Sequence, residues 1–149
     1  SRTEAQNFIN KYYELYPGVK KYMDDIIKEA YETGSVRTLF NRKREIEELN
    51  NRNYMIRMSG ERIALNTPIQ GTSADIIKKA MVLVFDEFKK QGIKSKMVLQ
   101  IHDELVIDTL KEEEEKVTKI VKDVMENVIK LDVPLKVGIA KGNDLYEAK

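Results

Sequence analysis

A histidine and two carboxylates stand together between two apolar runs in the stretch LQIHDELVID, residues 99–108. His102 is the chain's only histidine, and Asp103 and Glu104 follow it directly. Carboxylate oxygens on a rigid turn suit Mg²⁺, which takes few ligands from the protein and the rest from water and phosphate. A zinc site is a poor fit, because one histidine among acids does not give a full ligand set. The alternative interpretation is that Asp103 only forms the turn and that Glu104 is a solvated edge residue.

A second polar pattern lies in ERIALNTPIQGTSAD, where Arg62, Asn66 and Gln70 stand four residues apart. On a continuous helix these side chains would share one face. They can donate hydrogen bonds to the N3 and O2 acceptors of the DNA minor groove, where readout depends little on sequence. The pattern therefore indicates a surface that accepts any base pair. An ordinary polar helix face is the alternative.

Composition sets the limits within which these sites must work. The 149 residues are enough for one domain with a core, and 42% hydrophobic with 34% charged residues is typical of a folded chain. A net charge of +1 gives no overall signal for nucleic acid, so such a site must come from local clustering. The absence of cysteine excludes disulfides and thiolate metal sites. No apolar run reaches membrane-spanning length and no secretory signal is present, so we expect a cytoplasmic protein and no membrane partner.

Local clustering of positive charge occurs after the second predicted helix. The basic residues are Arg37, Arg42, Lys43, Arg44, Arg52 and Arg57. They could contact phosphates, although Glu45, Glu47 and Glu48 partly cancel their charge. A solvated charged surface is the alternative.

The elements that must position these residues follow from periodicity and breakers. In the first half we expect a helix over 2–16, started by a Ser1–Glu4 capping box, and a helix over 19–33 that ends at Gly34. A short hairpin or irregular arm follows. A third helix over 51–66 is expected to end at Pro68, because proline lacks the N–H and clashes with the preceding turn.

The second half reads as helix, strand, strand, helix, strand. Thr72 or Ser73 is expected to cap a new helix that ends at Gly92. Strands are predicted over 96–101 and 104–108, joined at His102-Asp103 as a hairpin turn. A helix over 111–130 and a last strand over 135–140 complete the pattern. The fold class is therefore α+β, an antiparallel sheet with packed helices preceded by a mostly helical segment. We place the boundary between a helical part, 1–50, and an α+β part, 51–149.

Together these stretches resemble the DNA polymerase I group, the family A DNA polymerases. NTPIQGTSAD followed by LQIHDELV carries the resemblance, and MVLQIHDELVID is similar to the third conserved motif of the family. GSVRTLFNRKREI is similar to the late fingers, and VPLKVGIAKGNDLYEAK to the family's C-terminus. Two departures are that the arm lacks the usual Gly before the arginines and Pro after them, and that Leu145 stands where Trp is common. The resemblance implies a fingers-like segment followed by a palm-like one.

The resemblance also implies roles for individual residues in nucleotidyl transfer from dNTPs to a primer 3′-hydroxyl. Asp103 is expected to be a catalytic metal ligand, with Glu104 in a supporting catalytic role beside the primer terminus. Gln100 and His102 are expected near the terminal primer pair. The row Arg62, Asn66 and Gln70 is expected to line the minor groove of the primer–template. The implied activity is that of a transferase acting in DNA replication and repair.

In this family a second metal-binding aspartate and the helix that holds the dNTP triphosphate belong to motifs upstream of these. A two-metal Mg²⁺ site would therefore take its second carboxylate from an upstream segment, in the same protein or a separate chain. The expected partners are primer–template DNA, a dNTP and that upstream remainder, and we expect the isolated chain to be inactive. The alternatives are a module that only binds primer–template and a structural fragment.

Overall fold

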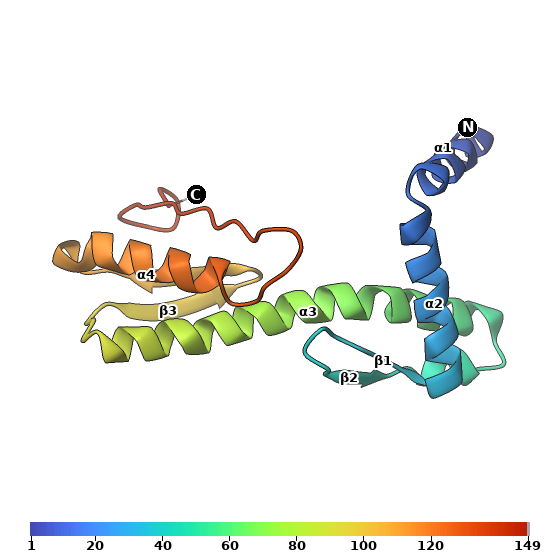
Figure 1. The fold of residues 1–149 in the computed structure, drawn as a ribbon, viewed down its shortest axis with the longest axis horizontal. Coiled ribbons are helices and arrows are strands. Elements are labelled where there is room, and N and C mark those ends of the chain that lie inside the picture. Colours follow the sequence, from blue (N-terminus) through green and yellow to red (C-terminus); the bar gives the residue numbers. More distant parts are fainter. Residues whose placement is uncertain (149) are drawn as a thin grey trace. The chain divides into compact units, whose positions relative to one another are not determined.

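The structure is a computed structural model that describes residues 1–148 (Figure 1). Its elements are α1 (Arg2–Leu15), α2 (Pro17–Thr33), β1 (Ser35–Arg37), β2 (Lys43–Glu45), the 3-10 turn η1 (Glu47–Asn50), α3 (Tyr54–Lys90), β3 (Lys96–Ile101), β4 (Glu104–Asp108), the 3-10 turn η2 (Lys111–Glu113) and α4 (Glu114–Glu126). Helices with two small antiparallel sheets confirm the predicted α+β class. No helix within residues 1–148 is long and apolar enough to cross a membrane.

The chain divides into two compact units, residues 1–72 and the residues from Ser73 onward. The division falls inside α3, which contributes its first part to one unit and its second part to the other. The boundary that we placed at residue 50 concerns a fingers-like and a palm-like part, and it stays a prediction.

Helices α1 and α2 begin and end where the local chemistry dictates. The Ser1 hydroxyl accepts a hydrogen bond from the Glu4 N–H at 3.3 Å and the Glu4 carboxylate bonds back to Ser1, which confirms the capping box. Helix α2 begins at Pro17, earlier than expected, because a proline at the first helical position loses no hydrogen bond. Gly34 ends it in the left-handed conformation, with φ 67°.

The segment after α2 is a hairpin that closes the core of the first unit. Strands β1 and β2 pair antiparallel from Ser35↔Glu45 to Arg37↔Lys43. The buried side chains of this core are Ala30, Val36, Ile46, Leu49 and Ala64. Burying a side chain such as Ile46 contributes about 1.5–3 kcal/mol. Gly60 lets α3 approach η1 closely, since a Cβ there would lie 3.0 Å from Leu49 Cδ2.

Helix α3 does not end at Pro68, so that expectation is wrong, and so is the helix start at Thr72 or Ser73. Pro68 lies inside one helix from Tyr54 to Lys90. Proline in a helix interior costs about 3 kcal/mol, but this part of α3 is packed, with Thr67 and Thr72 buried. The Thr67 hydroxyl donates to the Ile63 carbonyl at 2.7 Å, and the Thr72 hydroxyl donates to the Pro68 carbonyl. Tertiary packing of the helix therefore outweighs the local penalty.

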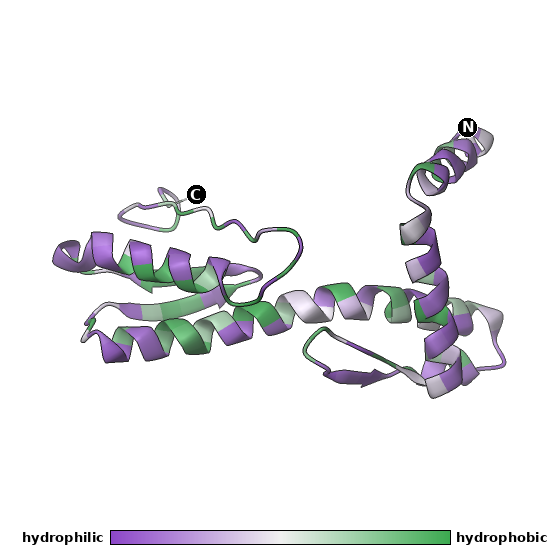
Figure 2. Cartoon of the chain, viewed as in Figure 1, coloured by the Kyte–Doolittle hydropathy of each residue, from purple (hydrophilic) through white to green (hydrophobic). Residues whose placement is uncertain are grey.

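The second unit packs α4 and strand β4 against the C-terminal part of α3. Its buried residues are Val84, Phe88, Val117, Ile120 and Val121. Figure 2 shows hydrophobic stripes on α4 and on this part of α3. Strands β3 and β4 have the predicted bounds, 96–101 and 104–108. Helix α4 is shorter than the predicted 111–130, since residues 111–113 form the 3-10 turn η2 and the helix ends at Glu126.

The strand predicted over 135–140 is absent, and that expectation is wrong. The alternation of apolar and polar residues is present, but a strand also needs a partner for its backbone groups. Here the Val137 N–H donates to Glu126 Oε1 at 3.1 Å, a side-chain acceptor on α4. The segment therefore follows α4 without joining the sheet.

One carboxylate closes the base of the β3–β4 hairpin. Glu113 accepts hydrogen bonds from the Ser95 hydroxyl at 2.6 Å, from the Ser95 N–H at 2.8 Å and from the Lys94 N–H at 3.0 Å. The Ser95 hydroxyl in turn accepts from the Leu110 N–H at 3.1 Å. The Ser95 hydroxyl bond, followed by the Lys94 N–H, lowers the pKa of the Glu113 carboxyl below its ordinary 4.5.

We expect Glu113→Gln to lower the thermal unfolding temperature at neutral pH. A pKa that is lower in the folded than in the unfolded chain adds stability above the ordinary value of 4.5, and this stability is lost as pH falls through the lowered pKa. The deficit of the variant should therefore shrink in acid. Unfolding temperatures of both proteins measured across the acid range check this. Glu115→Gln, in the first turn of α4, is the control, and an equal deficit at every pH would contradict the role of the Glu113 charge.

Candidate catalytic turn and nucleic-acid interface

His102 and Asp103 form a two-residue turn at the tip of the β3–β4 hairpin. Ile101 pairs with Glu104 across the last rung of the ladder, so the turn contains no further residue. His102 has φ 51°, a left-handed conformation in which histidine is enriched among non-glycine residues. The Gln100 side-chain amide donates to the His102 carbonyl and braces the turn. Gln100 and the three residues after Ile101 are all exposed, so Asp103 projects into solvent.

The direction of Glu104 follows from the pleat of β4. Ile107 packs against the core of the second unit. Successive strand side chains alternate between the two faces of a sheet, so Glu104, three residues earlier, lies on the face away from that core. Strand β3 carries one extra residue at Val98, between Met97, which pairs with Ile107, and Leu99. Such bulges increase the local twist and are frequent beside active sites.

The donor set at this turn fits one side of a magnesium site. Asp103 and Glu104 offer hard carboxylate oxygens, which Mg²⁺ prefers. Within residues 1–148 no group of three or more His, Cys, Asp or Glu side chains is placed to hold a metal ion. Asp103 is the residue that could bind the ion most directly, because it stands at the tip of the turn. A complete site needs further ligands beyond those that this turn brings together.

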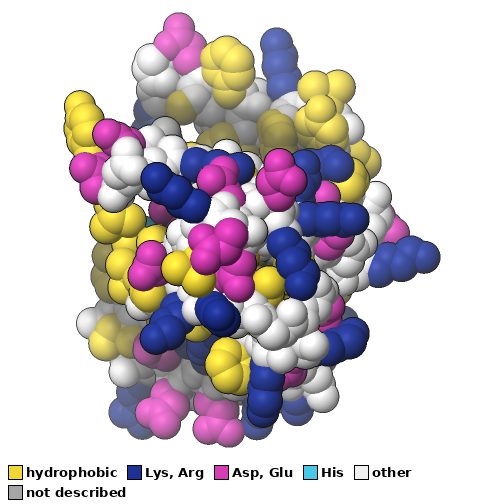
Figure 3. Space-filling model, turned by 90° about the vertical axis from the view of Figure 1, so that its left-hand side faces the viewer, with side chains coloured by type: hydrophobic (Ala, Val, Ile, Leu, Met, Phe, Trp, Pro, Cys, Tyr) yellow, Lys and Arg dark blue, Asp and Glu magenta, His cyan; other side chains and the backbone are white. Residues whose placement is uncertain are grey.

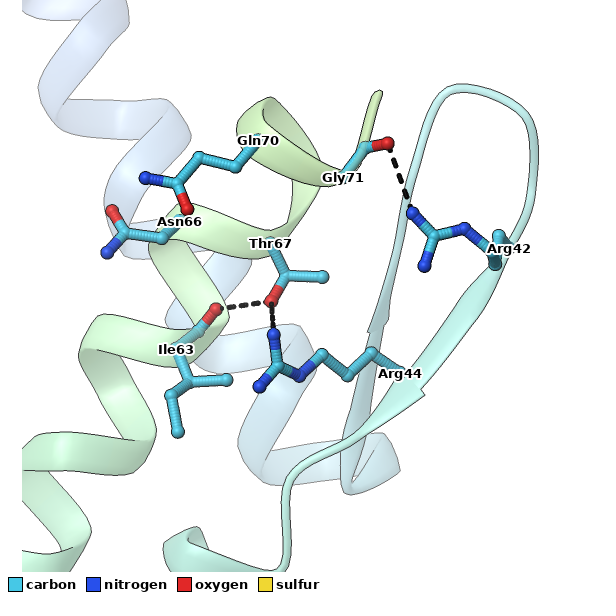
Figure 4. A pocket seen from close by; sticks show the side chains of 7 residues that line it. All are labelled: Arg42, Arg44, Ile63, Asn66, Thr67, Gln70 and Gly71. Atoms are coloured by element: carbon cyan, nitrogen blue, oxygen red, sulfur yellow. Dashed lines mark hydrogen bonds between the residues drawn. The ribbon is translucent and has the colours of Figure 1, made fainter. Parts of the chain in front are cut away.

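The predicted polar row lies on the first part of α3. Arg62, Asn66 and Gln70 are all exposed, and because α3 continues through Pro68 they occupy one face of a single helix. Figure 4 shows the Asn66 and Gln70 side chains extending together from one side of the helix. The continuity that the sequence left open is therefore present in the structure.

A pocket of about 330 Å³ joins this row to the hairpin of the first unit. Its lining residues are Arg42, Arg44, Ile63, Asn66, Thr67, Gln70 and Gly71. Arg42 Nη2 donates to the Gly71 carbonyl at 3.1 Å, and Arg44 Nη1 donates to Thr67 Oγ1 at 3.4 Å (Figure 4). Two guanidinium groups and two amides thus surround one hollow. The arrangement suits a ligand rich in anionic and neutral oxygen acceptors.

Sequence reasoning identified the basic arm and the polar row but did not bring them together. The sequence left open whether Arg42 and Arg44 contact phosphates or form a solvated surface on a separate segment, whereas in the structure they line one pocket with Asn66 and Gln70. The only signal available was a basic hairpin preceding the helix. Arg62 shares the helix face but does not line the pocket. On the face drawn in Figure 3, Lys and Arg are interspersed with Asp and Glu.

A comparison with known protein families shows to which family this chain belongs. The model of DNA polymerase family A matches residues 1–147. The chain belongs to this family.

Individual relatives agree with this family A assignment. DNA polymerase I of Caldicellulosiruptor bescii is 50% identical over 149 residues, which are 100% of this chain and 18% of the relative. DNA polymerase I of Bacillus subtilis is also 50% identical, with 17% of its length covered. The family A chain thus spans less than a fifth of these curated relatives. Among solved structures, the polymerase domain of Pol1 from M. smegmatis, in complex with DNA primer-template and dNTP, matches 99% of this chain with a TM-score of 0.95 and 37% identity, over 26% of that chain.

The left-handed conformation of His102 in this family A chain leads to a prediction about stability. We expect His102→Ala to be less stable than His102→Gly by about 1 kcal/mol, because alanine at positive φ keeps the backbone strain that glycine relieves. Urea unfolding of both variants measures the difference. The paired control is Asp108→Ala against Asp108→Gly in β4, where the order should reverse because glycine weakens a strand. Equal stability of the two His102 variants would contradict strain at this turn.

Proposed function

We propose that this chain provides the C-terminal part of a template-directed DNA polymerase, in which it contributes one catalytic metal carboxylate and minor-groove contacts to the primer–template. Family membership supports the polymerase reaction, and the similar Pol1 domain was solved with primer-template and dNTP. The observation that carries the proposal is the exposed two-residue turn that presents Asp103 beside Glu104. The proposed reaction is attack of a primer 3′-hydroxyl on the α-phosphate of a dNTP, with release of pyrophosphate.

In this proposal Asp103 holds Mg²⁺ together with a carboxylate from the upstream remainder of the polymerase. When bound, the two metal ions of such a site stabilise charge on the attacking and leaving oxygens. Glu104 stands beside the primer terminus on the face of the sheet away from the core. Gln100 braces the turn, and with His102 it lies near the terminal primer pair. The left-handed turn and the Glu113 bonds at the hairpin base support the tip from both ends.

The row Arg62, Asn66 and Gln70 is proposed to donate to minor-groove acceptors of the primer–template. Because the N3 and O2 acceptors are common to A·T and T·A pairs, a row of donors reads position and not sequence. Arg42 and Arg44 add positive charge beside the row, where backbone phosphates border the groove. The exposure of all three row side chains supports this role.

A chain that only binds primer–template is the second candidate. The observation that favours it is that the polar row is complete on one helix, whereas no metal-binding group of three side chains occurs within residues 1–148. The exposed apolar side chains of α1, among them Phe8 at 77% and Leu15 at 75%, fit a chain that packs against further protein.

Primer extension with Mg²⁺ and dNTPs separates the two candidates. The chain is assayed alone and then with the upstream remainder of the polymerase added. Extension only after the addition supports a metal site completed by the remainder. Extension by the chain alone would mean that a second metal carboxylate lies within it. Duplex binding without extension in both assays would favour the binding module.

In the completed polymerase, Asp103→Ala should reduce nucleotide addition by about a thousandfold or more. A metal ligand supports several kcal/mol of transition-state stabilisation, and each 1.36 kcal/mol is tenfold in rate. Duplex binding should remain largely intact. Single-turnover extension and primer–template titration measure the two effects. Asp108→Ala, at the other end of β4, is the matched control and should extend normally. Near-normal extension by Asp103→Ala would refute the metal-ligand role.

Gln70→Ala should weaken primer–template binding by about three- to tenfold, as expected for the loss of one or two hydrogen bonds. The loss should be similar for primers of different terminal sequence, because the proposed contacts read acceptors common to all pairs. Titration of several duplexes measures both quantities. Gln91→Ala makes the same chemical change after the end of α3 and serves as the control. A defect confined to one sequence would contradict the minor-groove role.

A further inference from the structure

The turn of the β1–β2 hairpin is seated on α3 through the hydroxyl of one buried residue. Thr72 Oγ1 accepts a hydrogen bond from the Leu39 N–H at 3.0 Å. The same hydroxyl donates to the Pro68 carbonyl one helical turn earlier. Thr72 therefore uses its donor within its own helix and its acceptor on the hairpin. A hydroxyl can make both bonds at once, whereas an apolar side chain of the same shape can make neither.

Gly71 allows the hairpin turn to approach α3 this closely. A Cβ at residue 71 would lie 2.7 Å from Cγ2 of Thr38 and 3.3 Å from Nη2 of Arg42. Thr38 cannot readily move, because it is buried and closes the turn: its N–H donates to the Arg42 carbonyl at 3.1 Å, and its hydroxyl accepts from the Arg42 N–H at 3.2 Å. The Gly71 carbonyl then accepts from Arg42 Nη2 at 3.1 Å.

This contact between the hairpin turn and α3 lies directly beside the polar row. Gln70 precedes Gly71 and Thr72 in the chain, and it lines the same pocket as Arg42. Pro68 supplies no N–H to the helix at this level, and such points are where helices bend most readily. Contacts from the hairpin to Thr67, Gly71 and Thr72 brace α3 over this stretch.

We propose that Thr72 and Gly71 are positioning residues that fix the hairpin turn on α3 and so hold the Arg42 guanidinium in the lining of the pocket that Gln70 also lines, as one preformed surface for the primer–template. The inference rests on the proposed function. In this proposal neither Thr72 nor Gly71 contacts the nucleic acid. Their effect is on affinity, because a guanidinium and an amide that are already in place lose less conformational freedom on binding. The chemical step at Asp103 does not depend on them.

The test uses the polymerase completed with its upstream remainder. Primer–template Kd is measured at several salt concentrations, together with the extension rate at saturating primer–template. Thr72→Val keeps the side-chain shape and removes the hydroxyl. It should raise Kd by about three- to tenfold and lower the salt slope by about one, as for the loss of one phosphate contact. The extension rate at saturation should stay unchanged. Thr72→Ser restores the hydroxyl and should restore both Kd and slope.

A second pair of variants tests the close approach independently of the hydroxyl. Gly71→Ala should raise Kd, because its methyl group meets Thr38 Cγ2. Thr38→Ser removes that methyl group and keeps the hydroxyl, so the double variant Gly71→Ala/Thr38→Ser should recover the affinity. Gly18→Ala is the matched control, since no atom lies within 4 Å of an added Cβ there.

The outcomes separate this inference from the function on which it rests. Unchanged Kd and salt slope in Thr72→Val, with normal binding by the unmodified polymerase, overturn the positioning role and leave the proposed function in place. A lowered extension rate at saturation with unchanged Kd also overturns it. Absence of primer–template binding by the unmodified, completed polymerase overturns both. Loss of affinity in Thr72→Val, recovered in Thr72→Ser, supports the inference even where Gly71→Ala fails to fold.

Discussion

The passage of α3 through Pro68 is the constraint on which the polar row and the pocket of the first unit depend. A proline removes one backbone hydrogen bond and crowds the preceding turn, yet the helix runs on from Tyr54 to Lys90. The buried threonines on either side of the proline donate to the carbonyls of Ile63 and of Pro68 itself, and the β1–β2 hairpin adds bonds from outside. Only because the helix continues do Asn66 and Gln70 share a face. The packing that tolerates the proline is thus also the packing that forms the pocket.

The His102-Asp103 turn depends on a different set of restraints. At its tip, His102 adopts a left-handed conformation and its carbonyl accepts from Gln100. At its base, Glu113 accepts hydrogen bonds from the N–H groups of Lys94 and Ser95, and the Ser95 hydroxyl in turn accepts from the N–H of Leu110, just after β4. A two-stranded hairpin is marginal by itself, so these bonds and the apolar core beneath Ile107 hold the carboxylates at the tip. Asp103 gains its exposure from the shortness of the turn.

Family membership and local geometry supply different information about this chain. The match to DNA polymerase family A extends over residues 1–147, while the chain spans 17–18% of the curated relatives named above. The turn brings together two carboxylates and no third ligand among the described residues. The residue types alone left open whether Asp103 binds a metal ion or only forms the turn, and the resemblance to the family's motifs favours the metal-ligand role that we propose.

The sequence by itself determined the features that depend on neighbours in the chain. Alternating apolar residues around a two-residue turn predicted both strands of the β3–β4 hairpin with their bounds, and the Ser1 capping box started α1 as expected. What required the tertiary structure were the features that depend on distant partners. Pro68 was expected to end a helix, because its local penalty is visible and the hairpin that offsets it is not. The segment 135–140 was expected to be a strand, because its alternation is visible and its lack of a ladder partner is not. The pocket that Arg42 and Gln70 both line was decided in the same way, since it is set by hairpin-to-helix packing and no spacing along the chain records it.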